Sequence, residues 1–273
     1  MRHLLLAILF CFSTIASVSA DPLTPALRQW QADGIERTGL VYAPKTAATA
    51  QTPVLFAFHG HGGTAQNAAD RWNYHRLWPE AIVVYLQGLP TPGALTDPLG
   101  KRNGWQKTAG DQNDRDLKFV DVVLASLKKQ YRVDEKRIYV TGHSNGGGFT
   151  YLLWAERSDT FAAFAPAGAG TRAVSSLKPK SAMHIAGEND ELVKFSNQQR
   201  TMEGIRKLNG CEAEGKEWAK SGTLTATRYP SKTGTPFVCV IYPGPHALPS
   251  EAPALVVKFF RELAEAKSEA DKR

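Results

Sequence analysis

The fold is decided by residues 137–149, which read Arg137-Ile138-Tyr139-Val140-Thr141-Gly142-His143-Ser144-Asn145-Gly146-Gly147-Gly148-Phe149. The part from Ile138 to Thr141 is a short β-branched and aromatic run that predicts a buried strand. Residues 149–155 contain no turn residue and predict a helix. Between them lies Gly-x-Ser-x-Gly, a strand-to-helix turn so tight that side chains two positions from the serine would have no room. Gly142 and Gly146 supply that room.

This turn makes Ser144 a candidate nucleophile. The turn sets the serine at the start of the following helix, where backbone N–H groups without intrahelical partners can face a developing negative charge. We expect the N–H of Asn145 to be one donor of such an oxyanion hole. A serine can also occur in a glycine-rich turn by chance, so the prediction depends on partners elsewhere in the chain.

A second donor is expected upstream of the turn. Residues 54–58 form a continuous apolar run, typical of a parallel strand covered on both faces. The run ends in His59-Gly60-His61-Gly62-Gly63, whose glycines let backbone amides approach a substrate. We expect the N–H of His61 to complete the oxyanion hole.

The two histidines of this loop could also chelate a metal ion. No nearby carboxylate or cysteine completes a ligand set, so we expect no metal and no other cofactor. His59 is interpreted as a structural histidine that bonds the loop backbone.

The acid and the base of a catalytic triad are expected downstream. Residues 181–187 predict a strand, and the carboxylates of Glu188, Asp190 and Glu191 follow it directly. A triad acid belongs just beyond the carboxyl end of a strand. Asp190 is chosen because the spacing Gly187-x-x-Asp190 turns the chain immediately after the strand. Of the seven histidines only His246 follows Asp190, so chain order leaves it as the base.

Strands and helices alternate along the chain. Further strands are predicted at 35–42, as an edge strand, and at 81–86, 161–165 and 237–241; helices are predicted at 114–131 and 253–266. This order predicts an α/β-hydrolase fold, with a mostly parallel central sheet and helices on both faces. The segment 87–113 has no periodicity. Its Trp105 has two open interpretations: it lines a substrate pocket, or it plugs the loop against the core.

The first 20 residues resemble a secretory signal peptide, with a basic start, an apolar run and the small residues Val18-Ser19-Ala20. We therefore expect a secreted or periplasmic protein whose residues 21–273 form one catalytic domain without a membrane span. The formal net charge is +7, but no long basic run indicates nucleic-acid binding. In an oxidising compartment Cys211 and Cys239 are expected to form a disulfide, with free thiols as the alternative.

The chain resembles secreted feruloyl esterases and polyhydroxybutyrate depolymerases, a group of α/β-hydrolases that also contains acetyl xylan esterases. The resemblance spans about residues 35–263. The matching motifs are the 59–63 loop, Asp116-x-x-Phe119-Val120, the 142–148 turn, Gly187-x-x-Asp190-x-x-Val193, Asn209-Gly210-Cys211 with Cys239, and Gly244-Pro245-His246. It implies a triad of Ser144, Asp190 and His246, with oxyanion donors near His61 and Asn145.

This sequence departs from the family pattern around the base. Similar proteins have a glycine before the catalytic histidine and a Trp-Pro pair after it, whereas Pro245 precedes His246 here and Ala247-Leu248-Pro249 follows. No linker or second domain for holding a polymer is recognised. We therefore expect soluble or oligomeric ester substrates rather than a crystalline polyester.

The predicted activity is hydrolysis of carboxylic esters through an acyl-enzyme. The acyl group is feruloyl or another hydroxycinnamoyl, acetyl, or 3-hydroxybutyryl in an oligomer. A serine peptidase of the same fold and a non-catalytic binding protein are the alternatives. The oligomeric state is not indicated by the sequence.

Overall fold

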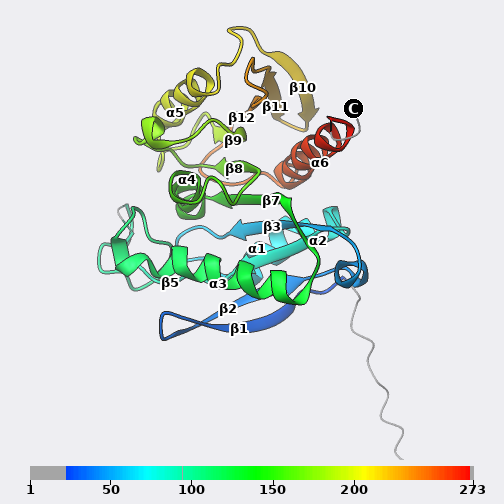
Figure 1. Ribbon diagram of the computed structural model, residues 1–273. Helices are drawn as coiled ribbons and strands as arrows, with labels where there is room; N and C mark the ends of the chain where they lie inside the picture. Colours follow the sequence, from blue (N-terminus) through cyan, green and yellow to red (C-terminus); the bar gives the residue numbers. More distant parts are fainter. Residues whose placement is uncertain (1–22, 94, 271–273) are drawn as a thin grey trace, which may run out of the picture.

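A computed structural model of the chain describes residues 23–93 and 95–270 (Figure 1). The predicted signal peptide lies outside these residues. The main feature of the described part is a ten-stranded sheet with the order β1-β2-β4-β3-β7-β8-β9-β12-β11-β10. The strands are β1 (Ala26–Ala32), β2 (Ile35–Tyr42), β3 (Thr52–Phe58), β4 (Ile82–Leu86), β7 (Val133–His143), β8 (Ala163–Ala167), β9 (Ser181–Gly187), β10 (Lys216–Ser221), β11 (Leu224–Tyr229) and β12 (Phe237–Tyr242).

The six central strands, from β4 to β12 in the sheet order, pair in parallel, and antiparallel strands flank them on both sides. All residues of β3 are buried, as its unbroken apolar run predicts for a strand covered on both faces. The predicted α/β architecture with a mostly parallel sheet is confirmed.

Helices cover both faces of the sheet and enclose two separate hydrophobic clusters. One face carries α3 (Arg115–Gln130), α4 (Asn145–Glu156) and α5 (Phe195–Leu208); the other carries α1 (Ala65–Trp72), α2 (Tyr74–Leu77) and α6 (Ala252–Ala270). Three short 3₁₀ turns, η1 (Lys45–Ala48), η2 (Asp111–Asp114) and η3 (Val174–Ser176), lie between them.

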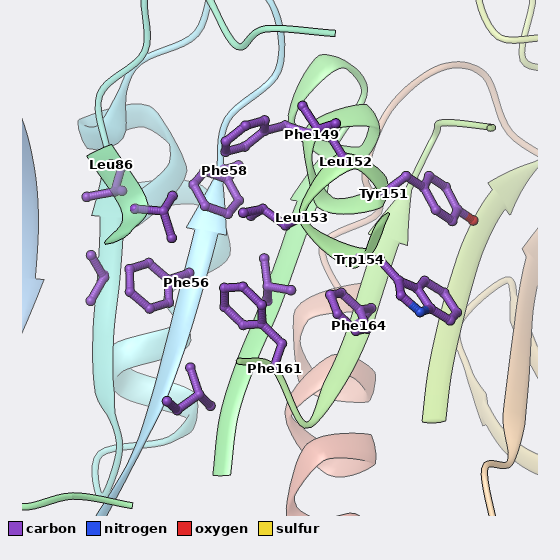
Figure 2. Close-up of a cluster of buried hydrophobic side chains, with 14 of the residues drawn as sticks. Phe56, Phe58, Leu86, Phe149, Tyr151, Leu152, Leu153, Trp154, Phe161 and Phe164 are labelled. Carbon is purple, nitrogen blue, oxygen red and sulfur yellow. The ribbon is translucent and has the colours of Figure 1, made fainter. Parts of the chain in front are cut away.

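The cluster under α4 is rich in aromatic side chains (Figure 2). The rings of Trp154 and Phe164 stack with centroids 4.8 Å apart, and Phe56 meets Phe161 edge-on at 6.2 Å. Because these side chains are buried between α4 and the sheet, the helix that starts directly after Ser144 is held rigidly against the strands.

One prediction about the sheet edge was wrong. Residues 35–42 form a strand, but it is the second in the sheet, because β1 pairs with it outside. The two strands join through Asp33 and Gly34, which both have positive φ, as a tight hairpin turn requires. Four of the seven residues of β1 are exposed, and its apolar residues are interrupted by Arg28, Gln29 and Gln31, so the segment lacks the apolar signal that identified the inner strands.

The long segment between β4 and α3 contains a two-stranded ribbon of β5 (Leu89–Pro90) and β6 (Asn103–Gly104). A buried ion pair, in which Arg37 donates to Asp116 Oδ1 at 2.8 Å, anchors this segment. Asp116 Oδ2 accepts the N–H of Gln106 at 2.7 Å, and Gln106 Oε1 accepts the N–H of Asp116. This segment is therefore fixed to the core although it has little regular structure.

Cys211 and Cys239 are free thiols in the structure, so the predicted disulfide is not formed in it. Cys239 lies in β12 and is buried, and Cys211 is partly exposed just after α5. Burial raises the pKa of the Cys239 thiol to about 12, which makes it unreactive in the folded protein.

Across the described ranges, no helix has both the length and the apolar character to cross a bilayer.

Candidate active site

Ser144 occupies a strained turn between β7 and α4. Its backbone has φ 58° and ψ −120°, outside the regions that a residue with a side chain normally adopts. Such a conformation costs about 1–3 kcal/mol and persists only where the surroundings enforce it. A Cβ on Gly142 would lie 2.4 Å from the carbonyl oxygen of Gly146, and a Cβ on Gly146 would lie 2.1 Å from that of Phe58. The structure thus requires both glycines, as the spacing of the motif predicts.

The three residues predicted as a triad come together at the carboxyl end of the parallel strands. His246 Nε2 lies 2.7 Å from Ser144 Oγ, and His246 Nδ1 lies 2.7 Å from Asp190 Oδ2. A carboxylate only accepts hydrogen bonds, so Nδ1 carries the proton and donates a hydrogen bond to Asp190. Nε2 is then free to accept the proton of the serine hydroxyl. This is the arrangement that activates a serine as a nucleophile.

Asp190 is the carboxylate that the structure buries, with 5% of its surface exposed, whereas Glu188 and Glu191 are exposed. Its Oδ1 accepts the N–H groups of Leu192 and Val193 at 3.0 and 2.8 Å. These bonds compensate the carboxylate for its lost hydration and fix its orientation.

The side chain of Gln198 also donates to Asp190, from Nε2 to Oδ2 at 2.9 Å. Gln198 is not among the residues predicted from the sequence, and neither is the helix α5 that carries it. Its only sequence signal is a glutamine on the buried side of an amphipathic helix, beside Thr201, Met202 and Ile205.

His143 packs against the predicted base, with the two imidazole centroids 5.0 Å apart. Burial is the main cause that lowers the pKa of His143 to about 4; the neighbouring His246 acts in the same direction, and Asp190 opposes it. His143 is therefore neutral at neutral pH and adds no charge beside His246. A Cβ on Gly168, which has φ 55°, would lie 3.0 Å from His143 Nε2, so the ring is tightly enclosed.

The two N–H groups predicted as oxyanion donors have no acceptor within the part of the chain that the structure describes. In the loop that carries His61, the neighbouring N–H groups of Gly62 and Gly63 donate to Asn103 and Gly60. The side chain of Asn145 is held at two points, since Oδ1 accepts from Trp105 N at 2.7 Å and Nδ2 donates to Trp105 O at 3.0 Å. The N–H groups of His61 and Asn145 are thus available to an external acceptor.

Both histidines of the 59–63 loop have structural partners. His59 Nδ1 donates to the carbonyl of Gly60 at 2.8 Å, and His59 Nε2 accepts the N–H of Gly88 at 3.0 Å, as expected of a histidine that bonds backbone. His61 Nε2 lies 3.2 Å from Asp97 Oδ2, which ties the loop to the long 87–113 segment. Within the described ranges, no three His, Cys, Asp or Glu residues gather as a metal site.

Trp105 is fully buried, so the structure favours the second of its two interpretations. Its indole stacks on Phe149 at 5.3 Å between ring centroids, and meets Phe58 edge-on at 5.0 Å. Its Nε1–H donates to the carbonyl of His59 at 2.9 Å. The ring plugs the loop against the core, because a large aromatic side chain gains more from burial there than from solvent.

A sequence profile of the prolyl oligopeptidase family matches residues 102–173, which include the turn around Ser144. A bifunctional acetylxylan esterase/xylanase of Neocallimastix patriciarum is 26% identical over 196 residues, 70% of this chain and 26% of that protein. A probable feruloyl esterase C of Aspergillus clavatus is 26% identical over 71% of this chain and 69% of its own length. The chain thus matches about a quarter of the first relative's length.

A solved acetyl xylan esterase from Aspergillus awamori superposes on 82% of this chain and 95% of its own, with a TM-score of 0.63 and 14% identity. This likeness supports the α/β-hydrolase fold. Together, the comparisons confirm the predicted resemblance to feruloyl and acetyl xylan esterases.

Proposed function

We propose that this chain, whose similar proteins are carboxylic ester hydrolases, is a serine esterase with Ser144, His246 and Asp190 as its catalytic triad. The observation that carries the proposal is the continuous hydrogen-bonded line from Asp190 through His246 to a serine in a strained turn. The names of the relatives support feruloyl or acetyl esters of carbohydrates as substrates. Esters of 3-hydroxybutyrate oligomers are the further candidate from the sequence motifs.

The reaction has two halves. Ser144 Oγ attacks the ester carbonyl while His246 Nε2 takes the hydroxyl proton, and the N–H groups of His61 and Asn145 stabilise the oxyanion. His246 returns the proton to the leaving alcohol, which leaves an acyl group on the serine. Water then attacks the acyl-enzyme with His246 as base, and the acid product departs with Ser144 restored. Asp190 orients the imidazole and stabilises its charged form throughout.

A cavity of about 420 Å³ lies in the anchored 87–113 segment, and its lining includes Thr91, Gly93, Lys107 and Gln112. Gly93 lies against the ring of His61, since a Cβ on it would lie 2.8 Å from His61 Nε2. The cavity thus adjoins the residue whose N–H is a proposed oxyanion donor, which supports it as the place of the alcohol part of the ester.

The test is Ser144→Ala in the mature chain, assayed with methyl ferulate, an aryl acetate and a soluble 3-hydroxybutyrate oligomer. Removing the nucleophile of such a triad lowers kcat by a factor on the order of 10⁶, while one lost oxygen leaves folding unchanged. A fluorophosphonate probe should label the wild-type protein at Ser144 and leave the variant unlabelled. Turnover of the variant at the wild-type rate, in a preparation free of host esterase, would exclude the proposal.

A serine peptidase is the second candidate, because the profile that matches residues 102–173 belongs to the prolyl oligopeptidase family. Amide and ester substrates with the same acyl group separate the two activities, and we expect the ester to be cleaved much faster. A binding protein without catalysis would react with neither substrate and would not be labelled by the probe.

We also propose that the protein is exported and that residues 21–273 fold as one domain. The support is the leader-like pattern of residues 1–20. Expression in a secreting host should give a mature protein that begins at Asp21, as N-terminal sequencing would determine.

A further inference from the structure

A chain of buried hydrogen bonds continues beyond the triad, on the side of Asp190 away from His246. Gln198 Nε2 donates to Asp190 Oδ2 at 2.9 Å and to the carbonyl of Val193 at 2.7 Å. Gln198 Oε1 lies 3.1 Å from His184 Nε2. His184 Nδ1 in turn lies 2.6 Å from the hydroxyl of Tyr151.

The direction of every bond in this chain is fixed. Asp190 and the Val193 carbonyl can only accept, so the NH₂ group of Gln198 must face them and Oε1 must face His184. His184 Nε2 is then the protonated nitrogen, and Nδ1 accepts the proton of the Tyr151 hydroxyl. Burial lowers the pKa of His184 to about 4, which keeps the ring neutral as this arrangement requires.

The chain joins three elements that lie far apart in the sequence. Tyr151 lies on α4, His184 lies on β9, and Gln198 lies on α5; all three side chains are buried. Figure 2 shows the Tyr151 ring leaving α4 on the side away from Phe58. Since α4 begins directly after Ser144 and Asp190 follows β9, the chain connects the helix of the nucleophile to the loop of the acid.

We propose that Gln198, held in its orientation by His184 and Tyr151, is a positioning residue that fixes the Asp190 carboxylate for its bond to His246. This inference rests on the proposed function of the triad. If the amide of Gln198 turned over, its oxygen would face Asp190 and the Val193 carbonyl, which can only accept, so these two groups set its orientation. The bond between His184 Nε2 and Gln198 Oε1 stabilises the same orientation.

The chain also controls the charge that His246 experiences. The hydrogen bond from Gln198 disperses part of the negative charge of Asp190 Oδ2, the same oxygen that accepts the hydrogen bond from His246 Nδ1. If the donor is lost, more charge faces His246 and its protonated form becomes more stable. The other titratable side chain against His246 is His143, which stays neutral and is the same in every variant below.

The main experiment is the pH profile of kcat/KM for Gln198→Leu against the wild-type protein. The variant loses a hydrogen bond to a charged group, and the transition state loses part of its stabilisation, so we expect kcat to fall about tenfold with KM nearly unchanged. The acid limb of the profile should move to higher pH. If activity falls equally at every pH and the limb stays in place, Gln198 only fills space and the inference is wrong.

A milder variant, Tyr151→Phe, tests whether the rest of the chain acts through Gln198. It should move the acid limb in the same direction by a smaller amount, and it should have no further effect on the limb when Gln198→Leu is already present. The matched control is Tyr139→Phe, since the Tyr139 hydroxyl is buried without a hydrogen-bond partner among the described residues. An unmoved limb in Tyr151→Phe, or a full additional shift in the double variant, would overturn the coupling.

Failure of this inference can be told apart from failure of the proposed function. The wild-type protein and Ser144→Ala establish first whether the triad hydrolyses esters at all. Denaturation curves of each variant establish that it is folded under assay conditions, and Tyr151→Phe, which loses a single oxygen, remains informative if Gln198→Leu does not fold.

Discussion

Adding one methyl group at Gly146 should disrupt the turn at Ser144, whereas the same change at Gly148, two residues along α4, should stabilise the protein. A Cβ on Gly146 would lie 2.1 Å from the Phe58 carbonyl oxygen and 2.6 Å from that of His59, both at the end of β3. A Cβ on Gly148 would meet nothing within 4 Å. A comparison of Gly146→Ala with Gly148→Ala therefore measures the effect of the close approach of α4 to β3.

The expected free energies follow from these contacts. In a helix, Gly→Ala gains about 1 kcal/mol from backbone entropy, and Gly148→Ala should show this gain alone. Overpacking costs about 1–3 kcal/mol, and Gly146→Ala should reach the upper end because backbone atoms block the methyl group on the strand side. The entropic gain is common to both variants and cancels in their difference, so they should differ by about 3 kcal/mol in the free energy of unfolding.

In Gly146→Ala the reactivity of Ser144 should fall together with the stability of the fold. To admit the methyl group, α4 must move away from β3, and the loop with His61 follows directly from β3. A displacement of about 1 Å at a reacting centre can cost a hundredfold in rate, so fluorophosphonate labelling of Gly146→Ala should be slower by about that factor. Urea denaturation gives the free energies and labelling kinetics give the rate. If Gly146→Ala is as stable and as reactive as Gly148→Ala, the account of this turn is refuted.

Three further predictions concern groups outside the triad. Asp116→Ala leaves the buried Arg37 without its carboxylate partner and should destabilise the fold by about 3–5 kcal/mol in urea denaturation, whereas Asp159→Ala, in an exposed ion pair with Lys178, should have a much smaller effect; equal effects would contradict the buried pair. Burial lowers the pKa of His59, His143 and His184 to about 4 from an ordinary value of 6.5, so between pH 6.5 and 4 the unfolded chain binds more protons than the folded one. Stability should therefore fall on acidification in that window, by up to about 1.4 kcal/mol per pH unit for each histidine, and a urea midpoint that is the same at pH 7 and pH 5 would oppose this. Because its thiol is buried, Cys239 should be alkylated by iodoacetamide at pH 8 only after unfolding; resistance that persists in denaturant and disappears with a reductant would instead reveal the disulfide predicted from the sequence.

Much of the fold could be predicted from local patterns. Residues 54–58 are an unbroken apolar run, and residues 181–187 are apolar or small apart from His184; both suit strands buried on both faces, and both are strands of the parallel centre. The outermost strands, β1 and β10, could not be found in this way. Only Ala32 of β1 is buried, and every residue of β10 is exposed or partly buried, so neither strand has the unbroken apolar run that identifies an inner strand.

For the site, the sequence by itself determined the turn at Ser144 and the order of Ser144, Asp190 and His246. The glycine spacing is visible in five consecutive residues, and the order of the proposed triad is a property of the chain, although the carbonyls of Phe58 and His59 that crowd Gly146 come from another strand. Only the tertiary structure decided that Trp105 is buried, that Asp116 pairs with Arg37, and that Gln198 holds Asp190. A polar side chain has no local signal for burial, because its partner comes from a strand or helix elsewhere in the sequence and is brought into contact only by folding.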